Sequence, residues 1–351
     1  MLLLVLLIIF LAVKCRRRAE RREMEVPMAE VLEYSPFFNL IYPTEHDLLD
    51  GIDKEGVFQP VRDGRPGTPF YGTTRIRSSK AGPIPSFHEG IDIAPAKRNR
   101  SGKPLDVIRC IADGTIAHIA RSPGGSTYGC YVVVIHDDPV GPIYSLYAHL
   151  SEVDGFLVKD QKVSAGDSLG VMGNTATYNI SMARAHLHLE IGVLMNSEFG
   201  AWAKKNGIKP DRGNYNGWNL QGVDPLGVYR ARSVTDFFAF GTYLSGVPVA
   251  FELVIKTDSL PNYFLLYPRL WTGQEYAGGA IVVALSEGAV PLSGRNATLE
   301  ESKKLSRQSL AVPQNVNESV LGGNGRRVIV KRRGNWELGS AASQWLDIFL
   351  Y

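Results

Sequence analysis

The sequence is poor in cysteine, with three among its 351 residues. Three thiols cannot form a dense disulfide framework, so the fold must depend on a hydrophobic core. Cys110 and Cys130 lie in two strand-like segments that could be neighbours. We predict that both are buried free thiols, because a disulfide requires a specific separation of the two Cα atoms.

The chain also carries little net charge. Its formal charge is +3, and much of the excess lies in one run, Lys14 to Arg22. A general nucleic-acid-binding protein usually has a strongly basic surface, so the composition predicts no nucleic-acid partner. With 44% hydrophobic and 21% charged residues the composition is that of an ordinary globular protein, and the length suggests two domains.

The apolar run at the N-terminus, Met1 to Val13, is shorter than the about 20 residues that span a bilayer. Its length fits the core of a secretion signal, although a preceding basic segment and a small-residue cleavage site are missing. We predict that residues 1–24 are a signal or membrane-anchor segment and that the protein is extracytoplasmic, in the periplasm or cell envelope. Lipidation at Cys15 and a start codon assigned at the wrong position remain alternatives.

The rest of the chain divides into three regions by composition. Residues 25–87 are rich in proline, glycine and aromatic residues, which predicts loops and edge strands leading into the next domain. Residues 88–230 contain short β-branched and aromatic runs punctuated by glycine, the pattern of an antiparallel β-domain. Residues 231–351 form an α+β accessory region of unknown role, with a hairpin-like segment from Arg327 to Leu338 and an amphipathic helix from Ala341 to Leu350.

Histidines are concentrated within the β-domain. Four of the seven fall inside three compact motifs: His88-Glu-Gly-Ile-Asp92, Tyr147-Ala-His149-Leu150 and His186-Leu-His188. A catalytic zinc site uses three protein ligands and keeps one position open for water, and two histidines with one aspartate meet that requirement. The other three histidines have no such context, and we interpret them as structural: His46, His118 and His136.

Strand alternation sharpens the third motif, because side chains two apart in a strand share a face. One face carries His186, His188 and Glu190, while the opposite face carries only leucine, isoleucine and valine. The apolar face belongs to the core. The histidine face must be open to a cleft or buried with partners, because unpaired polar groups are costly in a core. We interpret Glu190 as a solvated strand carboxylate.

The pair His88-Glu89 suggests the helical zinc motif HExxH, in which the glutamate is the general base. That motif fails here, because the fifth position is Asp92 and Gly90 argues against a rigid helix. A histidine must then carry protons, and His149 and His186 are the candidates outside the metal set.

These motifs resemble those of the lysostaphin-type peptidoglycan metalloendopeptidases. The resemblance covers a third to a half of the chain and rests on several segments in the family's order: HxxxD at His88 and Asp92, YAHL at His149, a glycine-rich stretch ending at Asn174, HLHLEI at His186 to Ile191, and Val223-Asp224-Pro225. Three spaced motifs in the right order are far more specific than any single one.

The resemblance implies one zinc ion held by His88, Asp92 and His188, with His149 and His186 flanking the water at the metal. It implies a mainly β fold: a small antiparallel β-sheet peptidase domain with an open groove, followed by the α+β accessory region. The expected substrate is a peptide cross-link or stem peptide of bacterial peptidoglycan. One departure, a longer and less glycine-rich segment from Thr175 to Ala185, changes the expected shape of one groove wall.

Two rival functions are weaker. A non-enzymatic scaffold of the same fold, regulating another cell-wall hydrolase, would typically lack some of the metal ligands, whereas this chain keeps all three and both flanking histidines. A lipoyl- or biotinyl-type carrier domain needs a lysine at a hairpin tip, but Met172 is followed by Gly173.

Overall fold

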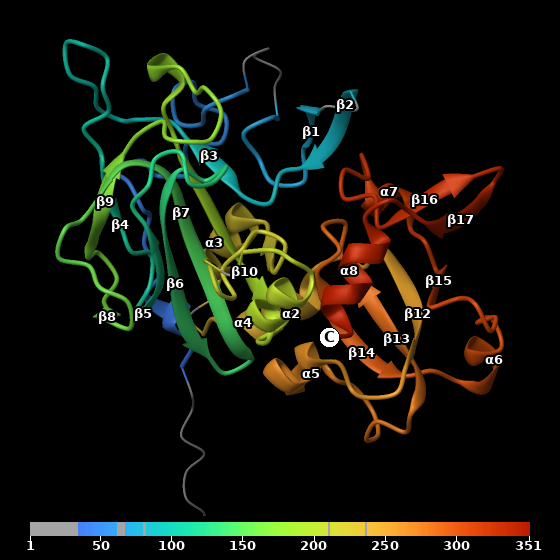
Figure 1. The fold of residues 1–351 in the computed structure, drawn as a ribbon. Helices are drawn as coiled ribbons and strands as arrows, with labels where there is room; N and C mark the ends of the chain where they lie inside the picture. Colours follow the sequence, from blue (N-terminus) through green and yellow to red (C-terminus); the bar gives the residue numbers. More distant parts are fainter. Residues whose placement is uncertain (1–33, 62–66, 80–81, 210, 236) are drawn as a thin grey trace, which may run out of the picture. The chain divides into compact units, whose positions relative to one another are not determined.

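A computed structural model describes residues 34–61, 67–79, 82–209, 211–235 and 237–351 (Figure 1). Residues 35–351 form one compact unit. The predicted signal or anchor segment, residues 1–24, and Cys15 lie outside the described residues. Within the described ranges, no helix is both long enough and apolar enough to cross a membrane.

The centre of this unit is an antiparallel sheet of nine strands. Its main order is β11-β10-β7-β6-β5-β8; β3 pairs with β10, while β9 pairs with both β4 and β7. The strands are β3 (Ile91–Ile93), β4 (Val107–Arg109), β5 (Gly114–Ala120), β6 (Cys130–Asp138), β7 (Gly141–Val153), β8 (Lys162–Val163), β9 (Ser168–Met172), β10 (Leu187–Leu194) and β11 (Leu220–Val223). The predicted antiparallel β-domain and the mainly β fold are confirmed.

Shorter elements surround this sheet. A separate hairpin of β1 (Thr74–Ser79) and β2 (Gly82–Phe87) leads into the first histidine motif. The helical elements of this part are η1 (Pro36–Asn39), η2 (Met182–Arg184), α2 (Phe199–Lys205) and α3 (Pro225–Ser233). Helix α3 begins where the sequence dictates, because the Asp224 side chain accepts a hydrogen bond from Leu226 N (3.0 Å) and Pro225 occupies the first turn.

The C-terminal region contains a four-stranded antiparallel sheet in the order β14-β13-β12-β15 and a hairpin of β16 and β17. Its strands are β12 (Phe251–Thr257), β13 (Gly279–Leu285), β14 (Pro291–Asn296), β15 (Ala311–Gln314), β16 (Ile329–Arg332) and β17 (Asn335–Leu338). Its helical elements are α4 (Phe240–Gly246), α5 (Asn262–Leu266), η3 (Pro268–Leu270), α6 (Leu299–Ser302), α7 (Glu318–Leu321) and α8 (Ala342–Phe349). The predicted hairpin and final amphipathic helix correspond to β16–β17 and α8.

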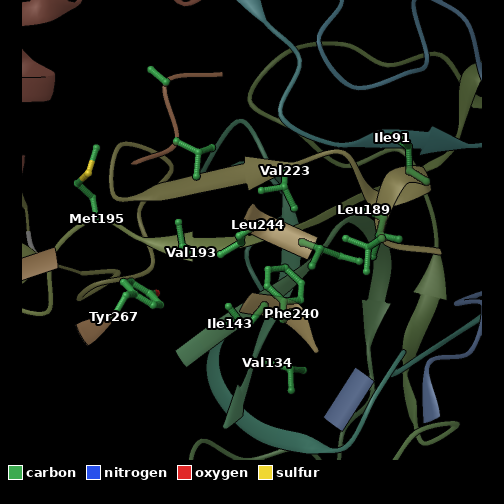
Figure 2. Close-up of a cluster of buried hydrophobic side chains, with 14 of the residues drawn as sticks. Ile91, Val134, Ile143, Leu189, Val193, Met195, Val223, Phe240, Leu244 and Tyr267 are labelled. Carbon is green, nitrogen blue, oxygen red and sulfur yellow. The ribbon is translucent and has the colours of Figure 1, made fainter. Parts of the chain in front are cut away.

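The two sheets share one hydrophobic core. Figure 2 shows residues of the nine-stranded sheet, such as Leu189 and Val193, in the same buried cluster as Phe240, Leu244 and Tyr267 of the later region. Gly141 marks a close approach between them: its φ is 138°, and a Cβ there would collide with the Leu266 carbonyl. The domain boundary expected at residue 231 stays a prediction.

Two features of the core match the sequence pattern. The apolar face of β10 is fully buried, with no exposed area at Leu187, Leu189, Ile191 or Val193. Cys110 and Cys130 are buried free thiols, as predicted. Burial raises the pKa of the Cys110 thiol to about 11, so it is a neutral core residue at physiological pH.

Tyr267 gives a test of how firmly the C-terminal region is joined to the central sheet. Its buried hydroxyl accepts a hydrogen bond from Leu194 N (2.8 Å) and donates to the Pro142 carbonyl (2.6 Å). Tyr267→Phe leaves these two groups without that partner, so we expect the free energy of unfolding to fall by about 2 kcal/mol. Chemical denaturation measures this.

The control is Leu265→Ala on helix α5, where the side chain is 65% exposed and the expected change is under about 0.5 kcal/mol. An equal effect of both substitutions would contradict the bridging role of the Tyr267 hydroxyl.

Candidate metal centre

Strand pairing brings the three histidine motifs together. In the register of β3 with β10, Asp92 lies opposite His188, and in the register of β7 with β10, Ala148 lies opposite His188. His149 therefore follows directly on the neighbouring strand, while His88 follows the end of β2. Residues separated by about a hundred positions in the sequence thus meet at one end of β10.

Three donor atoms converge at this end. His188 Nδ1 lies 2.9 Å from Asp92 Oδ1 and 3.1 Å from His88 Nε2, and His88 Nε2 lies 3.2 Å from Asp92 Oδ1. The three side chains are buried. Zinc bonds of about 2.0–2.1 Å in a tetrahedral arrangement place ligand atoms about 3.3 Å apart. The spacing and the donor types therefore fit a zinc ion.

Hydrogen bonds orient both imidazoles so that one nitrogen of each ring faces the other ligands. His88 Nδ1 lies 2.9 Å from the Phe70 carbonyl, which can only accept, so Nδ1 carries the proton and Nε2 keeps its lone pair. His188 Nε2 lies 2.8 Å from Glu190 Oε1, and its Nδ1 lies 2.9 Å from Asp92 Oδ1. Burial would lower the pKa of His188, but Asp92 and Glu190 raise it to about 9, so a metal would displace the proton on Nδ1 while Nε2 keeps its bond to Glu190. In each ring the nitrogen that faces the other ligands is the one placed to bind a metal.

Glu190 is a buried partner of His188, and the interpretation of it as a solvated carboxylate is wrong. Its side chain is 1% exposed and also accepts hydrogen bonds from Tyr128 Oη (2.8 Å) and Tyr144 Oη (2.9 Å). Burial alone would raise the pKa of Glu190, but His188 and the two tyrosines hold it below its usual value. Alternation indicated which face Glu190 lies on, but not that Tyr128 and Tyr144 cover that face.

Arg75 on β1 orients the third ligand. Its Nη2 donates to Asp92 Oδ2 (2.7 Å), so that Oδ1 faces the two histidine nitrogens. Nη2 also lies 3.0 Å from His88 Nδ1, a contact that is not a hydrogen bond while Nδ1 donates to Phe70. Burial would raise the pKa of Asp92, but His88, His186 and Arg75 hold it well below its usual value. No sequence motif marks Arg75, which lies in the region predicted as loops and edge strands.

His149 and His186 lie beside the three donor atoms, and each ring is held through its Nδ1 atom. The His149 ring is 4.8 Å from the His186 ring and 6.0 Å from the His188 ring, measured between centroids. His149 Nδ1 lies 2.8 Å from the Thr175 carbonyl, and His186 Nδ1 lies 2.8 Å from the Arg184 carbonyl. Each Nδ1 therefore donates to the backbone and leaves Nε2 able to accept a proton. Burial lowers the pKa of both imidazoles, which favours their neutral forms.

Glu89, which would be the general base of an HExxH motif, is paired with an arginine. Its Oε1 pairs with Arg326 Nη1 at 2.5 Å, and Arg326 also donates to Gln221 Oε1 (2.9 Å) and to the Gly288 carbonyl (3.0 Å). The residue next to the ligand His88 is therefore neutralised by an arginine of the C-terminal region. No local pattern indicates this pairing, because the two residues are 237 positions apart in the chain.

The three histidines interpreted as structural lie elsewhere. His136 is fully buried, with its ring nitrogens 2.8 Å from the Asp113 carbonyl and 2.7 Å from Ser145 Oγ. Burial lowers its pKa to about 4, so it is neutral. His118 on β5 packs against the Tyr131 ring, and His46 belongs to the loop before β1.

The contact between Glu190 and His188 predicts a loss of zinc affinity. Glu190→Gln keeps the shape but removes the charge that holds the His188 proton on Nε2, so we expect zinc to bind about 10- to 100-fold more weakly. Competition with a chelating dye measures the affinity, and circular dichroism checks the fold.

The matched control is Glu300→Gln, a carboxylate that is 81% exposed and should leave zinc affinity unchanged. Unchanged affinity in Glu190→Gln would refute the orienting role of this carboxylate.

Comparison with known proteins agrees with this geometry. Residues 86–199 match the model of peptidase family M23. A search of the curated proteins finds no match. Similar solved structures include a zinc-containing peptidase from Vibrio cholerae, with 20% identity, a TM-score of 0.26, and coverage of 39% of this chain and 36% of that one.

Two further structures are similar. The catalytic domain of the antimicrobial peptidase lysostaphin from Staphylococcus simulans has 24% identity, a TM-score of 0.26, and coverage of 35% of this chain and 77% of that one. Csd3 from Helicobacter pylori has 19% identity, a TM-score of 0.26, and coverage of 54% and 32%. TM-scores this low carry no argument of their own, so the assignment rests on the family model. The part of the chain that bears the histidine motifs, residues 86–199, is therefore the part that matches peptidase family M23.

Proposed function

We propose that this protein is a zinc-dependent endopeptidase that hydrolyses peptide cross-links or stem peptides of bacterial peptidoglycan. The observation that carries the proposal is the convergence of three atoms: His88 Nε2, Asp92 Oδ1 and His188 Nδ1. The second polar atom of each of these side chains makes a hydrogen bond that orients the side chain. The match to peptidase family M23, whose members generally cleave peptidoglycan, supports the same reaction class and substrate.

In this proposal His88, Asp92 and His188 hold one zinc ion. A bound zinc ion would lower the pKa of water to about 7 and polarise a peptide carbonyl. Arg75 balances the negative charge of Asp92 and fixes which oxygen faces the site. Glu190 holds the proton of His188 on Nε2.

Proton transfer falls to His149 and His186. Both have Nε2 unprotonated and Nδ1 anchored to a backbone carbonyl, so neither ring needs to reorient to accept a proton. One of them accepts a proton from the attacking water. The other first takes up a proton on Nε2 from solvent and, in that form, stabilises the developing oxyanion or protonates the leaving amine. Their neutral state suits the acceptor role near pH 7.

A non-enzymatic scaffold that regulates another cell-wall hydrolase is the alternative. The complete set of three ligand residues and two flanking histidines favours the enzyme, because a scaffold has no use for imidazoles held ready for proton transfer. We also propose an extracytoplasmic location, either secreted or anchored, because the substrate is outside the cytoplasm and the N-terminus carries an apolar run.

His188→Ala tests the metal-dependent reaction. Removing one of three ligands should abolish stoichiometric zinc binding and reduce the release of new amino termini from purified peptidoglycan to background. Zinc content is measured by elemental analysis, and the products are identified by mass spectrometry. His118→Gln is the control, with both zinc and activity expected to remain. An intact, folded protein that holds zinc but releases no peptide would point to the scaffold instead.

His149→Ala and His186→Ala separate catalysis from metal binding. Each should retain zinc, because neither residue belongs to the converging ligand set, while kcat should fall about 10²- to 10⁴-fold. The two measurements are made on the same preparations. Full activity in both variants would contradict their roles in proton transfer.

A further inference from the structure

A cavity of about 750 Å³ is lined in part by Tyr71, whose neighbours Phe70 and Gly72 both bond to His88. Its lining comes from both parts of the molecule: helix α3, the stretch between α3 and α4, helix α4, the turn between β13 and β14, and Val320 of α7. The walls are mostly apolar, and Val234 and Phe237 at the rim are 84% and 73% exposed. The volume is that of a typical small-molecule site. The family M23 match, residues 86–199, does not include the residues named here as lining it.

Glu287 contributes a carboxylate to the lining of this mostly apolar cavity. It lies in the turn between β13 and β14, and its carboxylate rests against the backbone of Gly72 and Gly322. A Cβ on Gly72 would stand 2.8 Å from Oε1, and one on Gly322 would stand 3.5 Å from Oε2. Among the described residues, no hydrogen bond or ion pair to the Glu287 side chain is present.

Other polar groups of the lining already have partners. Tyr71 Oη donates to the Gly222 carbonyl (3.0 Å), and Tyr243 Oη donates to the Asp224 carbonyl (3.1 Å). Asp224 caps helix α3 and lies 3.7 Å from Arg230. The guanidinium of Arg326, which bonds to the neighbouring Gly288 carbonyl, is directed to Glu89 and Gln221 instead.

Glu287 is half-buried, so its carboxylate loses part of its hydration without gaining a counter-ion, which is unfavourable. Burial and the negative charge of Asp224 raise the pKa of Glu287, in agreement with that cost. A cation placed in the cavity would pair with the carboxylate while its apolar part contacts the walls.

We propose that this cavity binds an organic ammonium ion carried on an apolar body. The apolar walls contact the apolar body, and Glu287 pairs with the ammonium group. Among the described residues of the lining, Glu287 is the acidic side chain with no hydrogen bond or ion pair. The site is separate from the proposed peptidase function and does not depend on it. The two are neighbours through Tyr71, because Phe70 and Gly72 on either side of it both bond to His88.

Calorimetry with three related probes tests the proposal on the full-length, zinc-loaded protein at pH 7. 4-Phenylbutylamine should bind about tenfold or more tightly than the neutral 4-phenylbutanol, and 4-phenylbutyrate should bind more weakly than either. Equal affinity for the amine and the alcohol, or no binding of the amine, would overturn the proposal.

Variants locate the probe. Glu287→Gln should reduce the preference for the amine over the alcohol to under about twofold, while Thr242→Trp, which fills the cavity from α4, should weaken both. Glu300→Gln should retain the full preference. Because an amine can also bind zinc, the titration is repeated with His188→Ala. Loss of amine binding there, with binding kept in Glu287→Gln, would assign the amine to the metal centre and refute the cavity site.

Discussion

The register of β10 against β3 and β7 is the constraint on which the rest of this structure depends. It places Asp92 opposite His188 and brings His149 alongside. A slip of one residue would turn every side chain of β10 to the opposite face. It would place the leucines among the polar groups of the site and remove His188 from its partners. Burial of the apolar face of β10 therefore fixes the strand register, and that register determines both the hydrophobic core and the candidate metal centre.

Acceptors behind the histidines complete the centre. Phe70 and Glu190 hold the two ligand rings, and the carbonyls of Thr175 and Arg184 hold the two flanking rings. The last two carbonyls both belong to the segment from Thr175 to Ala185 that departs from the family's usual length. In this protein the segment orients the rings of His149 and His186. Backbone acceptors of this kind can be supplied by any amino acid, so such a segment can change in sequence while the ring orientation stays.

The chain beyond residues 86–199 is packed into the same unit and contacts residues next to the candidate metal centre. Arg326 forms an ion pair with Glu89 beside His88. The Tyr267 hydroxyl makes hydrogen bonds to backbone groups of both β7 and β10. Because of these contacts, the C-terminal region is part of the same folded unit as the nine-stranded sheet. The same packing leaves the cavity around Glu287, where an apolar lining and an unpaired carboxylate meet.

The sequence by itself determined the residue types of the metal centre, the apolar face of β10 and the start of α3, because each is written in local spacing: HxxxD, strand alternation, and Asp224 followed by proline. Only the tertiary structure decided which residues orient that centre. No local pattern marks the orienting residues Arg75, Tyr128 and Arg326. The interpretation of Glu190 as solvated is wrong because strand alternation shows which face a side chain lies on, but not which other residues bury that face. Long-range pairing of strands and loops supplies that cover, and no window of the sequence contains it.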